Sequence, residues 1–260
     1  MTFPHNIRLA RPPYPIAAWL RRGSPFLWEV AIVLLVYAVY SLSKHLIYDD
    51  PKATAFDNAW RIVLLENDLS LFREAAIQRY FLYEHRVVAT VFELFYTIGY
   101  WPIILPTAIF LYWRRPAWYR EMRTVTLVVF LTALLVYALY PLAPPRFLPG
   151  FQDLHTYPYL NTFGESASHP LSANPYAAMP SVHFALTLVV SVFFWRMSGL
   201  LWKALAVGYV VMMFLTIVVT GNHYIVDALA SVVLVALAFA LARLATLVRQ
   251  RAPAASPTTS

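Results

Sequence analysis

The chain has 260 residues, of which 60% are hydrophobic and only 13% are charged, and its mean hydropathy is +0.58. This composition excludes an ordinary soluble domain and fits one compact bundle of membrane helices. The net charge is +7, but the arginines flank apolar runs and form no continuous basic face, so we expect no nucleic-acid partner. The chain has no cysteine, which excludes disulfides, thiolate metal sites and a cysteine nucleophile.

Apolar runs follow a polar, basic segment of residues 1–24. They cover residues 26–42, 87–113, 124–140, 183–195, 204–220 and 224–247. We extend the short fourth run to residues 181–201, because a membrane helix needs about 20 residues. In the second run, Pro102 and Pro106 are expected to kink the helix. The pattern predicts an all-α integral membrane fold, a six-transmembrane-helix bundle with interfacial helices. A cleaved signal peptide is the alternative for the first run, but no small-x-small site follows it.

The stretch between Asp57 and Arg86 is amphipathic and too charged to span a membrane. Its apolar members include Ile62, Leu65, Leu69, Phe72, Ala76 and Tyr80. We interpret it as one or two helices lying in the membrane interface. A plain connector between the first two spans is the alternative.

The distribution of basic residues predicts the orientation. Of the 20 Lys and Arg, 13 fall in the termini and even-numbered loops and seven on the opposite side. Because basic loops stay in the cytoplasm, both termini are expected there, and the loops that carry Arg146, His183 and His223 then face outward. Arginine greatly outnumbers lysine, which suggests a GC-rich bacterial genome and hence a bacterial plasma membrane.

His223 and Asp227 stand four residues apart at the start of the last run, so they share one helix face. A carboxylate in that position can accept the proton of one ring nitrogen and leave the other nitrogen free for attack. Ionisable groups at membrane depth are candidates for function. The alternative is a helix end whose polar residues only meet lipid headgroups.

Pro180 and Ser181 are typical of a helix start, with Ser181 at or near the N-cap. The free N–H groups and positive dipole of a helix N-terminus can hold a phosphate, and His183 would lie beside it, able to protonate a departing oxygen. A helix that is merely capped is the alternative.

Four prolines stiffen the loop of residues 141–150, which carries Arg146. A guanidinium held by a rigid loop can grip phosphate oxygens in a fork. A polyproline II connector with a solvated arginine is the alternative.

Three motifs together resemble the type 2 phosphatidic acid phosphatase superfamily, in its inositol phosphorylceramide synthase-like branch: Ala143–Arg146, Met179–His183 and Thr220–Asp227. The resemblance implies six membrane helices and phosphoryl transfer through a phosphohistidine, with neither a metal nor another cofactor. By position, it implies that His223 is the nucleophile, Asp227 its orienting carboxylate and His183 the acid. It implies a phosphate-binding role for Arg146, Ser181 and Asn222.

The chain departs from the superfamily pattern at three positions. Val182 replaces a usual glycine, Ile217 stands where a phosphate-binding arginine is usual, and no lysine precedes Arg146 at the expected distance. The inositol phosphorylceramide synthase-like branch tolerates such changes. They leave fewer cations than an ordinary lipid phosphatase has.

We therefore expect a lipid phosphatase or phosphotransferase that acts on a lipid-linked phosphate at the outer membrane face. Residues 1–24 would be a cytoplasmic segment, residues 25–248 the catalytic membrane domain, with part of the site on the outer loop 141–180, and residues 249–260 a cytoplasmic tail. Transfer of phosphoinositol to a lipid or sugar alcohol is one alternative, with inositol or a sugar alcohol as acceptor. A non-catalytic transporter or lipid-handling scaffold is another.

Two weaker candidates complete the set. The outer loop also holds acids and histidines that suggest a metal site, but without ligand spacing: Asp153, His155, Glu165 and His169. Glu93, Tyr96 and Tyr100 on the second span could line the substrate cavity, or Glu93 could simply bond a neighbouring helix.

Overall fold

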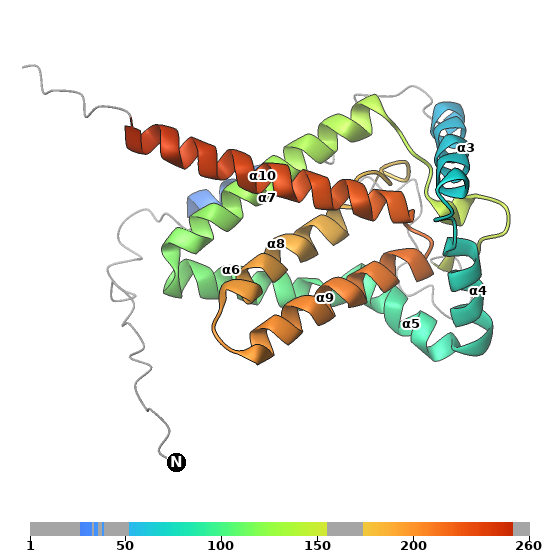
Figure 1. Ribbon diagram of the computed structural model, residues 1–260, viewed down its shortest axis with the longest axis horizontal. Coiled ribbons are helices and arrows are strands. Elements are labelled where there is room, and N and C mark those ends of the chain that lie inside the picture. The colour runs from blue at the N-terminus through green and yellow to red at the C-terminus, as the bar shows by residue number, and fades with distance from the viewer. Residues whose placement is uncertain (1–26, 33, 36–37, 39–51, 155–173, 252–260) are drawn as a thin grey trace, which may run out of the picture.

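The computed structural model describes residues 27–32, 34–35, 38, 52–154 and 174–251 (Figure 1). The elements are α3 (Lys52–Asp68), α4 (Glu74–Glu84), α5 (Arg86–Leu94), the π-helix η1 (Phe95–Gly99), α6 (Trp101–Arg114), α7 (Pro116–Leu139), the 3₁₀ turn η2 (Pro145–Phe147), α8 (Val182–Arg196), α9 (Leu200–Val219) and α10 (Ile225–Arg251). Within the described ranges there is no strand, and one β-bridge joins Leu142 to Ala177. The predicted all-α class is confirmed.

Four segments of the described chain are long and apolar enough to cross a membrane. They are Arg86–Arg114, which comprises α5, η1 and α6, then Pro116–Leu139, Leu200–Val219 and Ile225–Val248. The count of six stays a prediction. Much of the first run lies outside the described residues, and α8 has 15 residues, or roughly 22 Å, against a hydrocarbon core of about 30 Å.

The predicted continuation of the fourth span to residue 201 is wrong. Helix α8 ends at Arg196, and α9 begins at Leu200. Between them Gly199 has a φ of +105°, a conformation that favours glycine because a Cβ would be strained there. The short turn makes α8 and α9 antiparallel neighbours, and they pack closely along each other.

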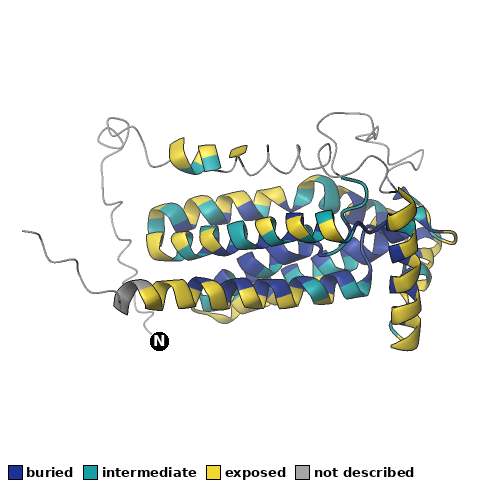
Figure 2. Cartoon of the chain, turned by 90° about the horizontal axis from the view of Figure 1, so that it is seen from above, coloured by how far each residue is buried: buried dark blue, intermediate teal, exposed yellow. Residues whose placement is uncertain are grey.

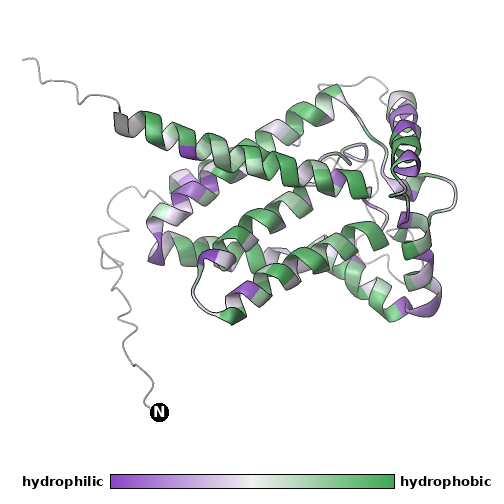
Figure 3. Cartoon of the chain, in the orientation of Figure 1, coloured by the Kyte–Doolittle hydropathy of each residue, from purple (hydrophilic) through white to green (hydrophobic). Residues whose placement is uncertain are grey.

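Helices α6, α7, α8, α9 and α10 form the bundle and share its core (Figure 1). Val189, Phe193 and Met213 are fully buried between them. The outward side is apolar too, as Figure 2 and Figure 3 show for α10, where Val233 and Leu237 are more than half exposed. An apolar exterior of this kind is compatible with an integral membrane protein.

The second predicted run forms one long segment interrupted by η1. Pro102 lies in the first turn of α6, where a missing N–H costs little, whereas Pro106 lies inside the helix. The π-helical turn comes just before these prolines and widens the helix at that point.

Helices α3 and α4 form from the amphipathic stretch, and α3 runs across the ends of the bundle helices (Figure 1). Their buried face is partly polar. Leu65 and Leu69 are exposed, whereas Glu66, Glu74 and Gln78 are fully buried. The pair of helices therefore contacts the rest of the chain through polar side chains as well as apolar ones, and its placement in the membrane interface stays a prediction.

Ion pairs tie α7 to its neighbours at the other end of the bundle. Arg196, the last residue of α8, holds Glu121 through two contacts of 2.6 and 3.0 Å. Arg123 pairs with Glu29, which lies in the helical residues 27–32. The described part of the first apolar run therefore contacts α7 through Glu29, while its leucines and Trp28 are exposed.

Candidate active site

His223 lies in the short loop between α9 and α10, and glycine shapes this loop. Gly221 has a φ of +66°, in the left-handed region. The N–H groups of Asn222 and His223 both donate to the carbonyl of Ile217, at 3.1 and 3.2 Å. A Cβ at Gly221 would lie 2.9 Å from Nε2 of Gln78. The loop is thus fixed by its own conformation and by the close approach of α4.

The imidazole of His223 is buried, and a backbone carbonyl orients it. Nδ1 lies 2.7 Å from the oxygen of Ala178 and 3.5 Å from Oδ2 of Asp227. Because a carbonyl oxygen can only accept, Nδ1 carries the proton and Nε2 carries a lone pair. Nε2 is buried without a hydrogen-bond partner in the described part of the chain. The ring therefore presents an unprotonated nitrogen that can attack an electrophile.

The surroundings of His223 keep its ring neutral. Its pKa is lowered to about 3, chiefly because burial disfavours the charged form. The hydrogen bond to Ala178 opposes this shift, and the positive charge of Arg146 adds to it. At pH 7 the ring is therefore in the basic form that a nucleophile requires.

Asp227 lies one helical turn beyond His223 and is fully buried. Its Oδ2 accepts the N–H of Tyr224 at 2.9 Å, so the carboxylate satisfies the start of α10 as well as facing the histidine. The structure brings the expected pair together, but Ala178 is the nearer acceptor for the ring.

His183 lies in the first turn of α8 and reaches the same site, with its ring centroid 6.5 Å from that of His223. Tyr96 stacks on His183 at 4.2 Å, and Tyr100 meets it edge-on at 4.7 Å. Tyr96 belongs to η1, and Tyr100 follows directly. The π-helical turn therefore sets an aromatic wall, formed by these two tyrosines, against His183.

Arg146 lies in η2, beside the loop of His223. Its N–H donates to the carbonyl of Gly221 at 2.8 Å. Its Nε lies 3.8 Å from Oδ1 of Asp153, and its guanidinium carbon lies 5.0 Å from the centroid of the Phe147 ring. The side chain is 13% exposed, so its charge acts in a largely desolvated place.

Backbone pairing joins the segment before η2 to the segment before α8. The N–H of Leu142 donates to Tyr176 at 2.8 Å, and the N–H of Ala178 donates to Leu142 at 3.3 Å. The hydroxyl of Tyr224 donates to the carbonyl of Ala143 at 3.0 Å. These bonds place the arginine loop, the orienting carbonyl and the start of α10 in one connected unit.

Ser181 is the N-cap of α8, as predicted, because its Oγ accepts the N–H of Phe184 at 3.3 Å. Its carbonyl accepts the hydroxyl of Ser231 at 3.0 Å, which joins α8 to α10. The amide of Asn222 donates to Oγ1 of Thr220 at 2.7 Å. Both predicted residues lie at the site, and their phosphate-binding role stays a prediction.

The PAP2 superfamily model matches residues 60–241, which is most of the chain and includes every motif described above. The chain belongs to the PAP2 superfamily. PAP2 proteins are generally phosphatases or phosphotransferases, so membership supports that type of activity on lipid phosphates. The match does not single out the inositol phosphorylceramide synthase-like branch. No curated protein and no solved structure matches the chain.

The suggested metal site of this PAP2 protein falls mostly outside the described residues, namely at His155, Glu165 and His169. Asp153 is described and faces Arg146. Among the described residues, no group of three or more His, Cys, Asp or Glu could hold a metal ion. Glu93 is buried in α5, three residues before Tyr96 on the aromatic wall.

Sequence reasoning missed two residues at this PAP2 site. Oε1 of Glu66 accepts the N–H of Val226 at 2.8 Å, and Oε1 of Glu74 accepts the N–H of Ile225 at 2.9 Å. Glu66 follows the buried Ile62 by four residues, so it lies on the same helix face. The available signal was the position of Glu66 on the same helix face as apolar residues. The interpretation of this stretch as an interfacial helix did not use it.

Proposed function

We propose that this protein is an integral membrane lipid phosphatase or phosphotransferase that works through a phosphohistidine. One observation carries the proposal. His223 is neutral, its Nδ1 proton is engaged by Ala178, and its Nε2 is buried without a partner among the described residues. Two further groups suited to phosphate chemistry, Arg146 and His183, lie beside it.

The first half of the reaction breaks the phosphate ester of the lipid. Nε2 of His223 attacks the phosphorus in line, the bond to the leaving oxygen breaks, and His183 gives that oxygen a proton. Arg146 and the N–H groups at the start of α8 hold the equatorial oxygens. Ser181 and Asn222 are proposed to complete this cradle.

In the second half, an acceptor hydroxyl attacks the phosphohistidine. His183 takes its proton, the P–N bond breaks, and the neutral ring of His223 returns. The proton on Nδ1 stays against Ala178, and Asp227 stabilises the positive charge that the ring carries while phosphorylated. The steps use side chains of the chain itself, and we expect chelators to leave turnover unchanged.

Transfer to an alcohol is the second candidate, and the aromatic wall favours it. Tyr96 and Tyr100 cover the ring of His183, which would activate the acceptor. Rings that exclude water from a reactive intermediate slow its hydrolysis and leave it for a bound alcohol. Inositol or a sugar alcohol is the proposed acceptor for this case, as in the inositol phosphorylceramide synthase-like branch.

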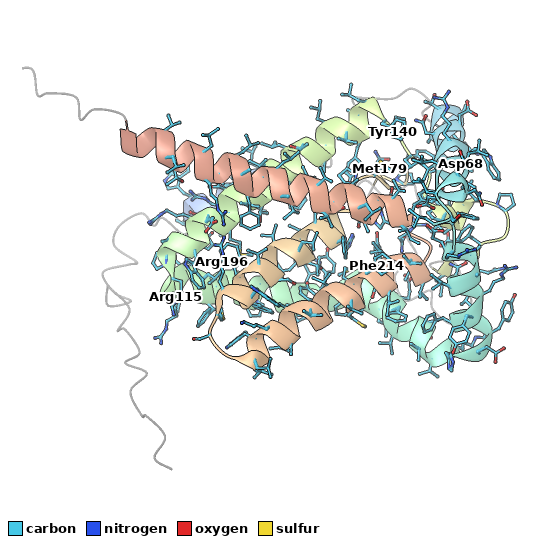
Figure 4. All side chains as sticks on the ribbon, viewed as in Figure 1. Asp68, Arg115, Tyr140, Met179, Arg196 and Phe214 are labelled. Carbon is cyan, nitrogen blue, oxygen red and sulfur yellow. The ribbon has the colours of Figure 1, made fainter. Side chains whose placement is uncertain are left out.

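The proposed topology has six spans, cytoplasmic termini and an outward-facing site in a bacterial plasma membrane. The positions of labelled residues in Figure 4 support it. Arg115 and Arg196 lie at one end of the bundle, whereas Met179, just before the start of α8, lies toward the end where α3 crosses. These two arginines thus lie away from the site, as expected for residues at a cytoplasmic end.

The proposal is tested with purified protein in lipid micelles and a panel of headgroup-labelled phospholipids and polyprenyl phosphates. Wild type and His223→Ala are compared with and without myo-inositol, and with and without EDTA. Label released as free phosphate identifies a phosphatase, and label moved into a new lipid only with acceptor identifies a transferase. Wild-type turnover no higher than that of His223→Ala on every substrate would refute the enzyme and favour the scaffold or transporter.

A further inference from the structure

The first turn of α10 takes hydrogen-bond acceptors from the helices that cross the end of the bundle. Ile225 donates to Glu74 of α4, 151 positions earlier, and Val226 donates to Glu66 of α3, 160 positions earlier. The first N–H groups of a helix have no partner within the helix, and buried ones need an acceptor. Two distant carboxyl groups meet this need directly after His223.

Both carboxyl groups are fully buried, which is unusual for acids. The second oxygen of Glu74 accepts the N–H of Arg73 at 2.9 Å. Burial, and next to it the neighbouring Glu74, raise the pKa of Glu66 to about 9. Glu66 is therefore neutral at pH 7, which avoids a further negative charge beside Asp227. Apolar side chains in their place would leave the N–H groups of Ile225 and Val226 without these acceptors, so the two acids do more than fill space.

The same pair of helices also holds the chain just before His223. The Nε2 of Gln78 in α4 lies 3.1 Å from the carbonyl of Val219, the last residue of α9, and 3.0 Å from that of Gln152. The N–H of Gln152 donates back to Oε1 of Gln78 at 2.8 Å. Helix α4 therefore bonds the loop of His223 on both of its sides.

We infer that Glu66 and Glu74 are positioning residues for phosphoryl transfer. By fixing the N–H groups of Ile225 and Val226, they set the loop so that Nε2 of His223 faces the phosphorus. They act through α10 rather than on the substrate, and the inference rests on the proposed function. A displacement of about 1 Å at a reacting group can cost on the order of 100-fold in rate.

A purely structural cap and a positioning residue give different kinetics. Loss of a structural cap lowers the amount of folded protein but leaves each folded molecule as fast as before. Loss of a positioning residue lowers kcat in protein that is still folded, with little change in KM. Gln keeps one oxygen that accepts an N–H, whereas Ala keeps none, so Glu66→Gln should restore what Glu66→Ala loses. Glu74 accepts two N–H groups, so Glu74→Gln should restore only part of the loss.

The experiment compares Glu66→Ala, Glu74→Ala and the two corresponding Gln variants with wild type. Asp68→Asn and Glu84→Gln are the matched controls, because these acids end the same two helices and are exposed. kcat and KM are measured on the best lipid substrate, below the unfolding temperature of every variant. The folded fraction is measured by size exclusion, and amide hydrogen exchange is followed in peptides that cover residues 221–228.

We expect kcat to fall on the order of 10- to 100-fold in each Ala variant, with KM within about threefold of wild type. Exchange at residues 221–228 should quicken in the same variants. Glu66→Gln and both controls should stay near wild type, and Glu74→Gln should lie between wild type and Glu74→Ala. Ala variants with wild-type kcat per folded molecule, or with unchanged exchange, overturn the inference while the proposed function stands. A wild type no faster than His223→Ala refutes the proposed function, and the inference with it.

Discussion

Asp227 and His223 face each other across 3.5 Å, between Oδ2 and Nδ1, and the same Oδ2 lies closer, at 2.9 Å, to the N–H of Tyr224. The carboxylate is thus shared between the helix start and the histidine. Since Ala178 already engages the Nδ1 proton, the tautomer of the ring does not depend on Asp227. In the proposed mechanism, Asp227 contributes a negative charge beside the ring once the ring is phosphorylated.

This arrangement predicts a moderate loss for Asp227→Asn. The ring keeps its tautomer, and only the electrostatic support of the phosphohistidine is removed. We expect kcat to fall on the order of 100-fold, short of the roughly 10⁴-fold loss seen where a carboxylate alone sets the tautomer. Steady-state kcat of Asp227→Asn, measured together with that of His223→Ala, checks this. A kcat of Asp227→Asn as low as that of His223→Ala would contradict the prediction.

Arg146 should affect both substrate binding and the pH dependence. Arg146→Lys keeps the charge but loses the fork, and should lose about tenfold in kcat/KM, whereas Arg146→Gln should lose 100-fold or more. The charge of Arg146 lowers the pKa of His223, so its removal raises that pKa. In the proposed mechanism the neutral ring is the reactive form, so the acid limb of the rate profile should move to higher pH in Arg146→Gln alone. Identical acid limbs in the two variants would argue against this reading.

Gly221 offers a test of how tightly the loop of His223 is built. Gly221→Ala adds left-handed strain of about 1–2 kcal/mol and a Cβ placed 2.9 Å from Nε2 of Gln78. Gly199→Ala is the matched control, since Gly199 also has a positive φ but has open space around it. Both should lower the thermal midpoint, and Gly221→Ala alone should also lower kcat. Equal kcat in the two variants would show that the close approach of Gln78 to Gly221 does not affect turnover.

The buried Glu66 predicts a pH-dependent stability. Its pKa is raised from 4.5 to about 9, chiefly by burial and by Glu74, so between these pH values the folded protein holds a proton that the unfolded chain releases. The free energy of unfolding should therefore fall as pH rises from about 5 to 9, by up to about 1.4 kcal/mol per pH unit. The carboxylate of Asp227 also faces Glu66 and acts in the same direction.

Glu66→Gln should remove this dependence, because an amide does not titrate. Thermal midpoints in micelles at several pH values measure it, with the exposed Glu84→Gln as control. The gap between Glu66→Gln and wild type should open as pH rises, while Glu84→Gln follows wild type. Parallel curves for all three proteins would mean that Glu66 is ionised when folded.

The sequence predicted the helical class and the residues gathered at the site, because these follow from apolar runs and local spacing. Ser181 caps α8, and His223 and Asp227 share a face, since both relations span only a few residues. The end of α8 was misplaced, because a sequence of apolar residues continues past Gly199 while the backbone turns there.

Contacts across long sequence distances were beyond the reach of the sequence. The bonds of Glu66 and Glu74 to the start of α10 join helices 151 positions or more apart. Hydrophobic periodicity points only to apolar residues, so it gave no sign that Glu66 is buried while Leu65 and Leu69 are exposed. Periodicity alone does not predict that Glu66 and Glu74 are buried beside each other.

The atom that orients His223 belongs to the main chain, at Ala178, and this limits what side-chain mutagenesis can reveal. Every amino acid carries the same main-chain carbonyl. Substitutions at position 178 can therefore leave this contact intact and make the residue look dispensable. Comparison of homologous sequences has the same blind spot. Only a change to the backbone, such as an amide-to-ester replacement that weakens this acceptor, would show how far the orientation of the proposed nucleophile depends on it.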